Sequence, residues 1–236
     1  MIDGLARRLL AEFIGAAFLL AAVVGSGIMA ERLTDDDGLR LLQNAFATAG
    51  VLIALILALG AVSGAHFNPA VTIVDRAFGG VDTPTALWYI AAQVAGAIAG
   101  VVVANLMFDL DPVNWSTTDR SVSNLVLAES VATLGLLLVI FGIVRAGRSS
   151  AVAFAVGGYI AGAYYFTSST RFANPAVTIA RTMSDTFAGI EPASAPLFIA
   201  AQLVAVGVAI VVVRTLYPDI AEVADQVVVP HGGSSS

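Results

Sequence analysis

The sequence predicts an all-α membrane protein with six transmembrane helices and two re-entrant half-helices, arranged as an inverted repeat. Three observations predict this fold class. Of the 236 residues, 58% are hydrophobic and only 12% are charged, whereas a soluble domain carries about 25% charged residues. Six apolar stretches are long enough to cross a bilayer, and two more reach only half that length. One six-residue motif occurs once in each half of the chain.

The six long stretches each provide the roughly 20 apolar residues that one crossing requires. Gly, Ala and Ser recur in all of them, and such small residues let helices pack closely in lipid. The first stretch follows Arg7 and Arg8, as in a signal peptide, but it is too long for one, so we expect a retained span. The predicted spans are about 8–29, 40–61, 85–107, 122–144, 149–168 and 196–217.

Two apolar stretches are too short to span the membrane. They follow Asn68 and Asn174 and run to about Phe78 and Ser184. About ten residues at 1.5 Å per residue cover half a bilayer. Non-helical backbone at membrane depth is tolerated only inside protein or beside a water-filled cavity. The two short segments therefore predict a cavity within the membrane.

The two halves of the chain share three sequence anchors in the same order. Asn-Pro-Ala-Val-Thr-Ile occurs at 68–73 and again at 174–179. The other anchors are a Glu within the first span of each half and an Ala-Ala-Gln late in each half, giving the pairs Glu12 and Glu129, and Gln93 and Gln202. Three spans per half is an odd number, so the second half enters the membrane from the opposite side, as in an inverted repeat.

We expect one channel domain over 1–217, built from repeats of about 1–116 and 117–217, followed by a flexible tail at 218–236. The positive-inside rule places both termini in the cytoplasm, because more arginines fall on that side of the layout. Those on the cytoplasmic side are Arg7, Arg8, Arg145, Arg148 and Arg214, and those on the other side are Arg32, Arg40 and Arg120.

The boxes Asn68-Pro69-Ala70 and Asn174-Pro175-Ala176 are helix starts. Asn is a strong N-cap, and Pro is favoured at the first helical position. Inversion makes the two short helices enter from opposite faces and meet N-terminus to N-terminus. Each helix N-terminus carries roughly half a positive charge. Two such ends at a narrow passage oppose the entry of cations and protons.

The segment 63–72, Ser-Gly-Ala-His-Phe-Asn-Pro-Ala-Val-Thr, resembles the signature of the aquaporin (major intrinsic protein) family. The second box, the repeated Glu residues and the layout of spans are similar as well, over about 1–217. The resemblance implies a pore within six tilted helices, a homotetramer in the plasma (inner) membrane, and passage of small neutral solutes without chemical turnover. It implies no cofactor.

The resemblance also implies roles for individual residues. Asn68 and Asn174 would donate their amides to a passing oxygen, which interrupts a proton wire. The stretches at about 63–67 and 168–173 would line the pore with carbonyls, and His66 and Phe67 belong to the first. The alternative for His66 is a packed side chain that pins its loop.

The two intramembrane carboxylates, Glu12 and Glu129, are costly in lipid and need partners. The resemblance implies that they hold the two loops by accepting backbone N–H bonds, and proton relay is the alternative role. Gln93 and Gln202 are expected to bridge backbone groups in the same way.

The chain departs from the family pattern at the pore constriction. Relatives place an Arg directly after the second box, where this chain has Val177. Counting from the two boxes, the other constriction positions fall on Thr48, Gly162 and Arg171. Thr48 and Gly162 are small, which implies a wide mouth suited to solutes larger than water.

Two arginines near the second box are open to more than one interpretation. Arg171 either supplies the guanidinium that Val177 lacks or extends to the surface and pairs with an acid. Arg181 lies four residues after Val177, so it either lines the vestibule or pairs with Asp185.

A subgroup of bacterial relatives is similar in having Asn-Pro-Ala-Val-Thr-Ile-Ala-Arg and a Phe-Ala-Gly stretch, here 187–189. That subgroup is associated with arsenite in its neutral triol form. The predicted function is therefore a passive channel for water, glycerol and metalloid hydroxides such as arsenite. A strict water channel is the alternative within the same class.

Other functional classes fit the sequence less well. A secondary transporter usually needs a charged coupling-ion site at mid-membrane, and no Asp, Glu or Lys lies beside either box on that side. An adhesive, non-conducting protein would not need two intact boxes. An enzyme is disfavoured because the chain has two His, no Cys and no catalytic or metal-ligand cluster at workable spacing. The absence of a basic run argues against nucleic acid as a partner.

Overall fold

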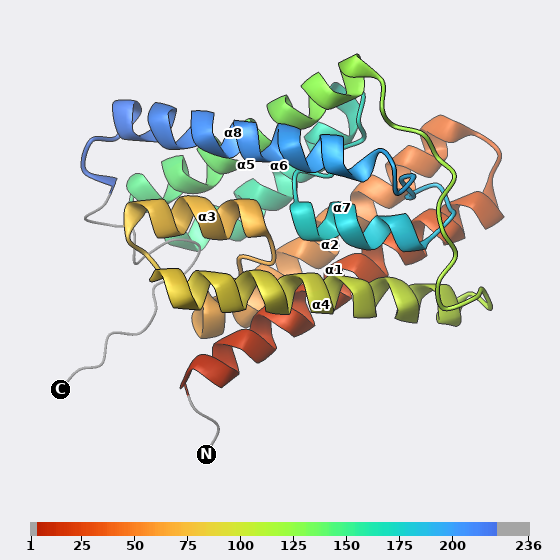
Figure 1. The fold of residues 1–236 in the computed structure, drawn as a ribbon, viewed down its shortest axis with the longest axis horizontal. Helices are drawn as coiled ribbons and strands as arrows, with labels where there is room; N and C mark the ends of the chain where they lie inside the picture. Colours follow the sequence, from red (N-terminus) through yellow and green to blue (C-terminus); the bar gives the residue numbers. More distant parts are fainter. Residues whose placement is uncertain (1–3, 221–236) are drawn as a thin grey trace.

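The computed structural model describes residues 4–220, in which all regular structure is helical (Figure 1). The predicted tail at 218–236 lies outside the described residues from 221 on. The helices in chain order are α1 Gly4–Leu33, α2 Asp37–Ser63, α3 Pro69–Phe78, α4 Thr83–Met107, α5 Ser123–Arg145, the 3₁₀ turn η1 Ser149–Ala151, α6 Val152–Phe166, α7 Pro175–Ala180, the 3₁₀ turn η2 Arg181–Met183, and α8 Ala195–Leu216.

Five of these helices, α1, α2, α4, α5 and α8, are long and apolar enough to cross a membrane, which confirms five predicted spans. The sixth predicted span, 149–168, is shorter than expected. Its helix α6 has only 15 residues, or 18 with the preceding turn η1. The helix ends where the Thr167 backbone N–H and hydroxyl both donate to the Ala163 carbonyl, and the chain then turns inward. The second loop of the repeat therefore starts earlier than the hydropathy suggested.

The two half-helices are present and run in opposite directions from the centre of the molecule (Figure 1). Helix α3 extends toward the end that carries the N-terminus, and α7 extends toward the other end. Asn68 and Asn174 are the N-caps, each with extended backbone, and proline follows each of them at the first helical position. The sequence rule for helix starts therefore predicted both caps.

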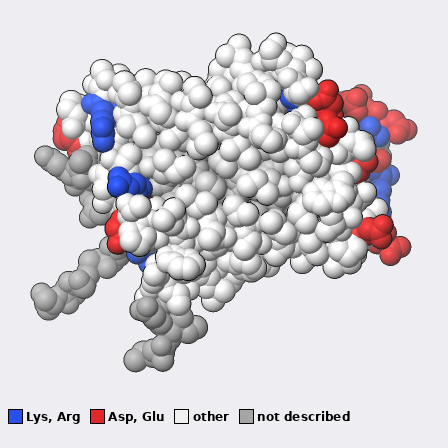
Figure 2. All heavy atoms as spheres, viewed as in Figure 1, with Lys and Arg blue, Asp and Glu red and all other residues white. Residues whose placement is uncertain are grey.

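Charged side chains gather at the two ends of the molecule and leave an uncharged band between them (Figure 2). Large apolar side chains face outward on α1, α2, α6 and α8, among them Phe18, Phe46, Phe154 and Val204. An apolar outer surface bounded by two charged ends is what a bilayer requires of a multi-pass protein.

Helices α1 and α4 pack backbone against backbone at two glycines. A Cβ placed on Gly96 would lie 2.2 Å from the Phe13 carbonyl oxygen, and one on Gly100 would lie 2.1 Å from the Ala17 carbonyl oxygen. The four-residue spacing of these glycines puts both on one face of α4. In the second repeat, α8 has the small buried residues Ala205 and Ala209 at the same spacing. Small residues thus set the helix distances that hold the half-helices between the spans.

Candidate functional site

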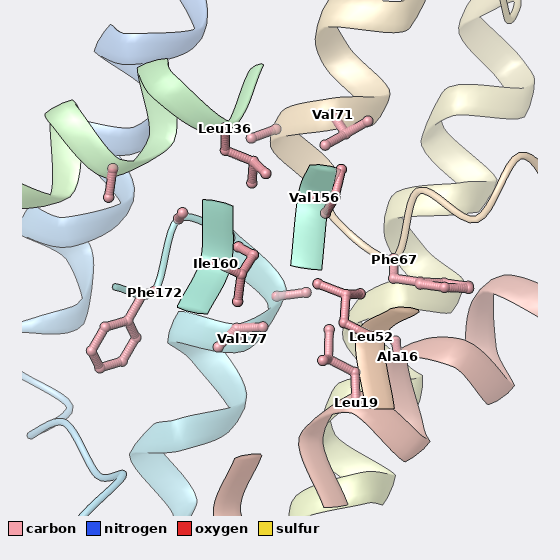
Figure 3. Packing of buried hydrophobic residues seen from close by; sticks show 14 of the residues in the cluster. Ala16, Leu19, Leu52, Phe67, Val71, Leu136, Val156, Ile160, Phe172 and Val177 are labelled. Carbon is pink, nitrogen blue, oxygen red and sulfur yellow. The ribbon is translucent and has the colours of Figure 1, made fainter. Parts of the chain in front are cut away.

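A cavity of about 40 Å³ lies where the caps of α3 and α7 meet. This volume is the space open to the centre of a water molecule, of which one water needs about 10–15 Å³. One wall is apolar and includes side chains that point into a shared space, Leu52, Leu136, Val156 and Ile160 (Figure 3). The loop residues 65–68 and 171–174 line the cavity as well. The cavity therefore combines an apolar wall with a polar stripe of amides and backbone.

The amides of Asn68 and Asn174 link the two half-helices at this cavity. Asn68 Nδ2 donates to the Ala173 carbonyl, and Asn174 Nδ2 donates to the Phe67 carbonyl, both at 2.8 Å. The side-chain oxygens accept from backbone N–H groups at the start of their own half-helices. An amide NH₂ has two hydrogens, so each Asn keeps one donor beyond this asparagine link. Both side chains line the cavity, so the remaining donors can serve an oxygen inside it.

The two loops before the boxes share an unusual backbone. Ala65 and Phe67 have φ of 50° and 49°, and the corresponding Arg171 and Ala173 have φ of 55° and 48°. Non-glycine residues in the left-handed region cost about 1–3 kcal/mol each and persist only where their surroundings hold them. The repeated conformation therefore requires strong external support for both loops.

The buried carboxylates provide that support. Glu12 Oε1 accepts from the His66 N–H at 3.0 Å, and Glu12 Oε2 accepts from the Phe67 N–H at 2.7 Å. Glu129 accepts from the N–H groups of Phe172 and Ala173 in the corresponding way. Each carboxylate thus satisfies two backbone donors that the left-handed loop leaves without a helical partner.

Gln93 and Gln202 connect these carboxylates to the half-helices. Gln93 Nε2 donates to Glu12 Oε2 at 2.7 Å and to Thr72 Oγ1 at 2.9 Å. Gln202 Nε2 donates to Glu129 Oε1 at 3.3 Å and to Thr178 Oγ1 at 2.9 Å. The glutamines were expected to bridge backbone groups, but their amides donate to side-chain oxygens instead. The loop N–H groups are already bonded to the two carboxylates.

His66 lines the cavity and is also tied to its surroundings. Its Nδ1 lies 3.0 Å from Thr72 Oγ1, and its Nε2 lies 3.6 Å from the buried carboxylate of Asp75. The ring packs edge-on against Tyr89. Phe67 contributes its carbonyl to the asparagine link, whereas its ring points away from the cavity and packs over Gly15 of α1 (Figure 3).

Counting from the boxes predicted Gly162 as a constriction residue, and its position in the structure does not fit that role. Gly162 is exposed on the outer face of α6, and a Cβ there would meet only the ring of Phe166. Tyr164 faces inward instead, on the same face as Ile160, and its hydroxyl lies 3.0 Å from Thr48 Oγ1. The count failed because a distance along the chain from Asn174 does not fix which face of α6 a residue occupies. The four-residue spacing of Val156, Ile160 and Tyr164 was the signal that could have identified Tyr164.

A buried phenol ring thus occupies the inward face of α6 where a glycine was expected, and the width of the mouth stays a prediction. A second hollow of about 530 Å³ opens to solvent at the end of the molecule opposite the N-terminus. Thr170 lines this outer hollow, whereas its neighbour Arg171 lines the inner cavity. The boundary between the two spaces therefore passes through this pair of residues, beside Tyr164.

Arg171 points inward rather than to the surface. Its side chain is buried with the residue 5% exposed, it lines the cavity, and its guanidinium lies 5.2 Å from the centre of the Tyr164 ring. Within residues 4–220 it makes no ion pair with a carboxylate, and its Nε has no hydrogen-bond partner. The alternative in which it pairs with an acid at the surface does not occur.

Arg181 occupies neither of the two positions considered for it. It is 2% exposed, donates from Nε to the Ala188 carbonyl, and lies 3.5 Å from the centre of the Phe172 ring. Asp185 accepts from the backbone N–H of Thr117 instead. Arg181 therefore braces the segment after η2, and the arginine that lines the outer hollow is Arg120. Val177 lines the inner cavity from the first turn of α7.

Comparison with known proteins gives consistent matches. A family model described as major intrinsic protein matches residues 3–151. Aquaglyceroporin AqpS from Rhizobium meliloti (strain 1021) is 48% identical over 90% of this chain and 91% of its own length. The lens fiber major intrinsic protein of Rattus norvegicus is 33% identical over 67% of this chain and 64% of its own. The aquaglyceroporin structure from Plasmodium falciparum covers 94% of this chain and 99% of its own, with a TM-score of 0.68 at 22% identity, and so shares the fold.

Proposed function

The chain belongs to the major intrinsic protein family of membrane channels, and on that premise we propose which solutes its pore selects and which residues select them. It is a multi-pass, passive channel for water and small neutral solutes rather than an enzyme. The proposed permeants are water, glycerol and neutral metalloid hydroxides such as arsenite. The proposed selecting residues are Thr48, Tyr164, Arg171 and Val177.

The asparagine link carries the proposal. Asn68 and Asn174 hold the two half-helix N-termini against each other and each keeps one N–H for the cavity. A neutral oxygen that accepts from both turns its own hydrogens away along the pore, which interrupts proton transfer. The two facing helix ends add positive potential that repels cations. Neutral hydroxyl compounds remain the class that this arrangement admits.

The permeant class follows from the two walls of the cavity. A polyol or a metalloid triol has hydroxyl groups for the polar stripe and a less polar side for the leucine, isoleucine and valine wall. The 48% identity to a protein described as an aquaglyceroporin supports the same class. The second candidate is a strict water channel. The 3.0 Å contact between the hydroxyls of Tyr164 and Thr48 favours it.

We expect replacement of Arg171 with Ala to change the ratio of water to glycerol permeability about tenfold, because a hydrogen bond to a charged group contributes about 1.5–3 kcal/mol. The measurement is stopped-flow light scattering of proteoliposomes with water, glycerol and arsenite gradients. Arg214→Ala is the control, since the Arg214 guanidinium also lies over an aromatic ring, that of Phe78, but at the other end of the pore. An unchanged permeability profile for Arg171→Ala contradicts the proposed role. Glycerol and arsenite flux equal to that of empty liposomes would leave a strict water channel.

A second expected result concerns the mouth itself. Tyr164→Ala should raise glycerol permeability several-fold, because it removes the buried ring that contacts Thr48 and Arg171. Tyr164→Phe keeps the ring and should leave glycerol permeability near the wild-type value. The matched control is Tyr165→Ala, since the neighbouring Tyr165 is 54% exposed on the outer face of α6. Equal glycerol permeability in the Tyr164→Ala and Tyr165→Ala variants would contradict this position of the constriction.

The remaining parts of the proposal concern assembly and orientation. The channel forms one domain over 1–217 and assembles as a homotetramer, as the family resemblance implies. Both termini lie in the cytoplasm and the protein resides in the plasma (inner) membrane. The distribution of arginines between the two sides of the layout supports this orientation.

A further inference from the structure

Arg120 lies in the connection between α4 and α5, outside the predicted spans, yet it is only 9% exposed. Its Nε donates to the Gly189 carbonyl at 2.9 Å, and its Nη1 lies 3.5 Å from the Ser169 carbonyl. The guanidinium also lies 5.3 Å from the centre of the Phe172 ring. One side chain thus joins three stretches of chain, two of which flank α7.

The connection that carries Arg120 is itself fixed to the segment after η2. Backbone bonds run from Asn114 to Met183 and from Ser116 to Thr182, at 3.0 and 2.9 Å. A Cβ on Gly189 would lie 2.3 Å from the Ser116 hydroxyl, so the two stretches touch as closely as glycine allows. The position of Arg120 is therefore set by the extramembrane connection rather than by a span.

The residues on either side of Arg120 fix its backbone. The Arg120 N–H donates to the Ser194 hydroxyl at 3.0 Å, and the same hydroxyl donates to Asp119 at 3.0 Å. Hydrogen bonds from Ser121 and Ser194 hold the pKa of the Asp119 carboxyl below its usual range. Asp119 therefore stays ionised at neutral pH and keeps these bonds to both serines.

The two repeats differ in how the start of each loop is held, and this difference identifies the role of Arg120. In the first repeat the Ser63 carbonyl accepts from the Tyr89 hydroxyl at 2.9 Å. In the second repeat the corresponding carbonyl belongs to Ser169. Phe198 packs edge-on against Phe172 there, as Tyr89 packs against His66. Phe198 has no hydroxyl to donate, and Arg120 supplies the donor instead.

Ser169, whose carbonyl Arg120 contacts, is also bonded to Arg171 through its side chain. Ser169 accepts from the Arg171 N–H through its hydroxyl at 3.4 Å. Arg171 has a left-handed backbone, and the next residue, Phe172, is covered by the guanidinium groups of both Arg120 and Arg181. A shift of Ser169 or Phe172 would therefore turn Arg171 relative to the cavity.

We propose that Arg120 is a positioning residue of the pore, which fixes the direction of Arg171 from the extramembrane connection and so sets discrimination between solutes at that mouth. The proposal rests on the proposed role of Arg171 in selection. It assigns part of the selectivity of the pore to a segment outside the membrane.

The test compares Arg120→Gln, Arg171→Ala and the double variant by stopped-flow permeability to water and glycerol. We expect Arg120→Gln to shift the permeability ratio severalfold in the same direction as Arg171→Ala. The double variant should match Arg171→Ala alone, because Arg120 acts through Arg171. Arg120→Lys should give an intermediate ratio, since an ammonium group cannot reproduce the fork of a guanidinium. If Arg120→Gln gives no monodisperse protein, the ratio of Arg120→Lys decides.

Arg32→Gln is the matched control, because Arg32 donates to the Phe108 carbonyl and covers the Phe108 ring near the same mouth without contacting the loop of Arg171. It should lower stability without changing the ratio. A wild-type ratio in Arg120→Gln, or shifts that add in the double variant, would overturn the proposal even if Arg171→Ala changes selectivity. Wild-type water flux equal to that of empty liposomes would instead remove the proposed function itself.

Discussion

Replacing Gly100 with Ala should lower the free energy of unfolding by about 3 kcal/mol or more, since overpacking usually costs about 1–3 kcal/mol where side chains can adjust. At Gly100 the obstacle is backbone, because the new Cβ would lie 2.1 Å from the Ala17 carbonyl oxygen. Helices α1 and α4 would have to separate. That separation would move Glu12 away from Gln93, and so disturb the support of the first loop.

The measurement is the midpoint temperature of thermal unfolding of the detergent-solubilised protein. Size-exclusion chromatography after heating reports how much protein remains folded. Gly158→Ala and Gly207→Ala are matched controls, because a Cβ at either position meets nothing within 4 Å. Both should be neutral or slightly stabilising, since Ala has the higher helix propensity. A Gly100→Ala variant as stable as these two would show that the α1–α4 distance can relax.

Replacing Glu12 with Gln should reduce water permeability per channel at least about tenfold and destabilise the fold by about 3 kcal/mol, because hydrogen bonds to a charged acceptor contribute about 1.5–3 kcal/mol each. Glu12 accepts from four donors, His66 N–H, Phe67 N–H, the Ser63 hydroxyl and Gln93 Nε2. A Gln has one acceptor oxygen, so its NH₂ group would face donors. The left-handed loop would lose its support.

Stopped-flow measurements at matched protein content, together with thermal stability in detergent, check this prediction. Glu31→Gln is the control, because Glu31 lies on the same helix in an exposed position. Wild-type permeability in Glu12→Gln would mean that the loop holds its conformation without the carboxylate.

The sequence predicted the parts of this fold that follow local rules. The three residues Asn-Pro-Ala are enough to predict a helix N-cap. The repeated Glu and Gln predict two sites at which buried side chains hydrogen-bond to similar loops. The positions of Asn68 and Asn174 at the centre followed from these rules and from the odd number of spans per half. None of these inferences required knowing how residues far apart in the sequence lie in space.

The constriction could not be predicted in the same way, because its position depends on the length of an irregular loop. Counting back from Asn174 does not fix which face of α6 a residue occupies, and Gly162 within α6 is exposed. The left-handed conformation of Arg171 had no sequence signal, since glycine is absent there. The burial of Arg120 depends on contacts between two extramembrane segments.

The asparagine link also has a consequence for biosynthesis. Each half contributes one amide and one carbonyl to the pair of bonds, so a nascent chain that ends before Asn174 leaves the Asn68 amide and the Phe67 carbonyl unmatched. Such groups are costly inside a bilayer. The first half therefore cannot close this link on its own, and the two bonds form only after Asn174 has been synthesised.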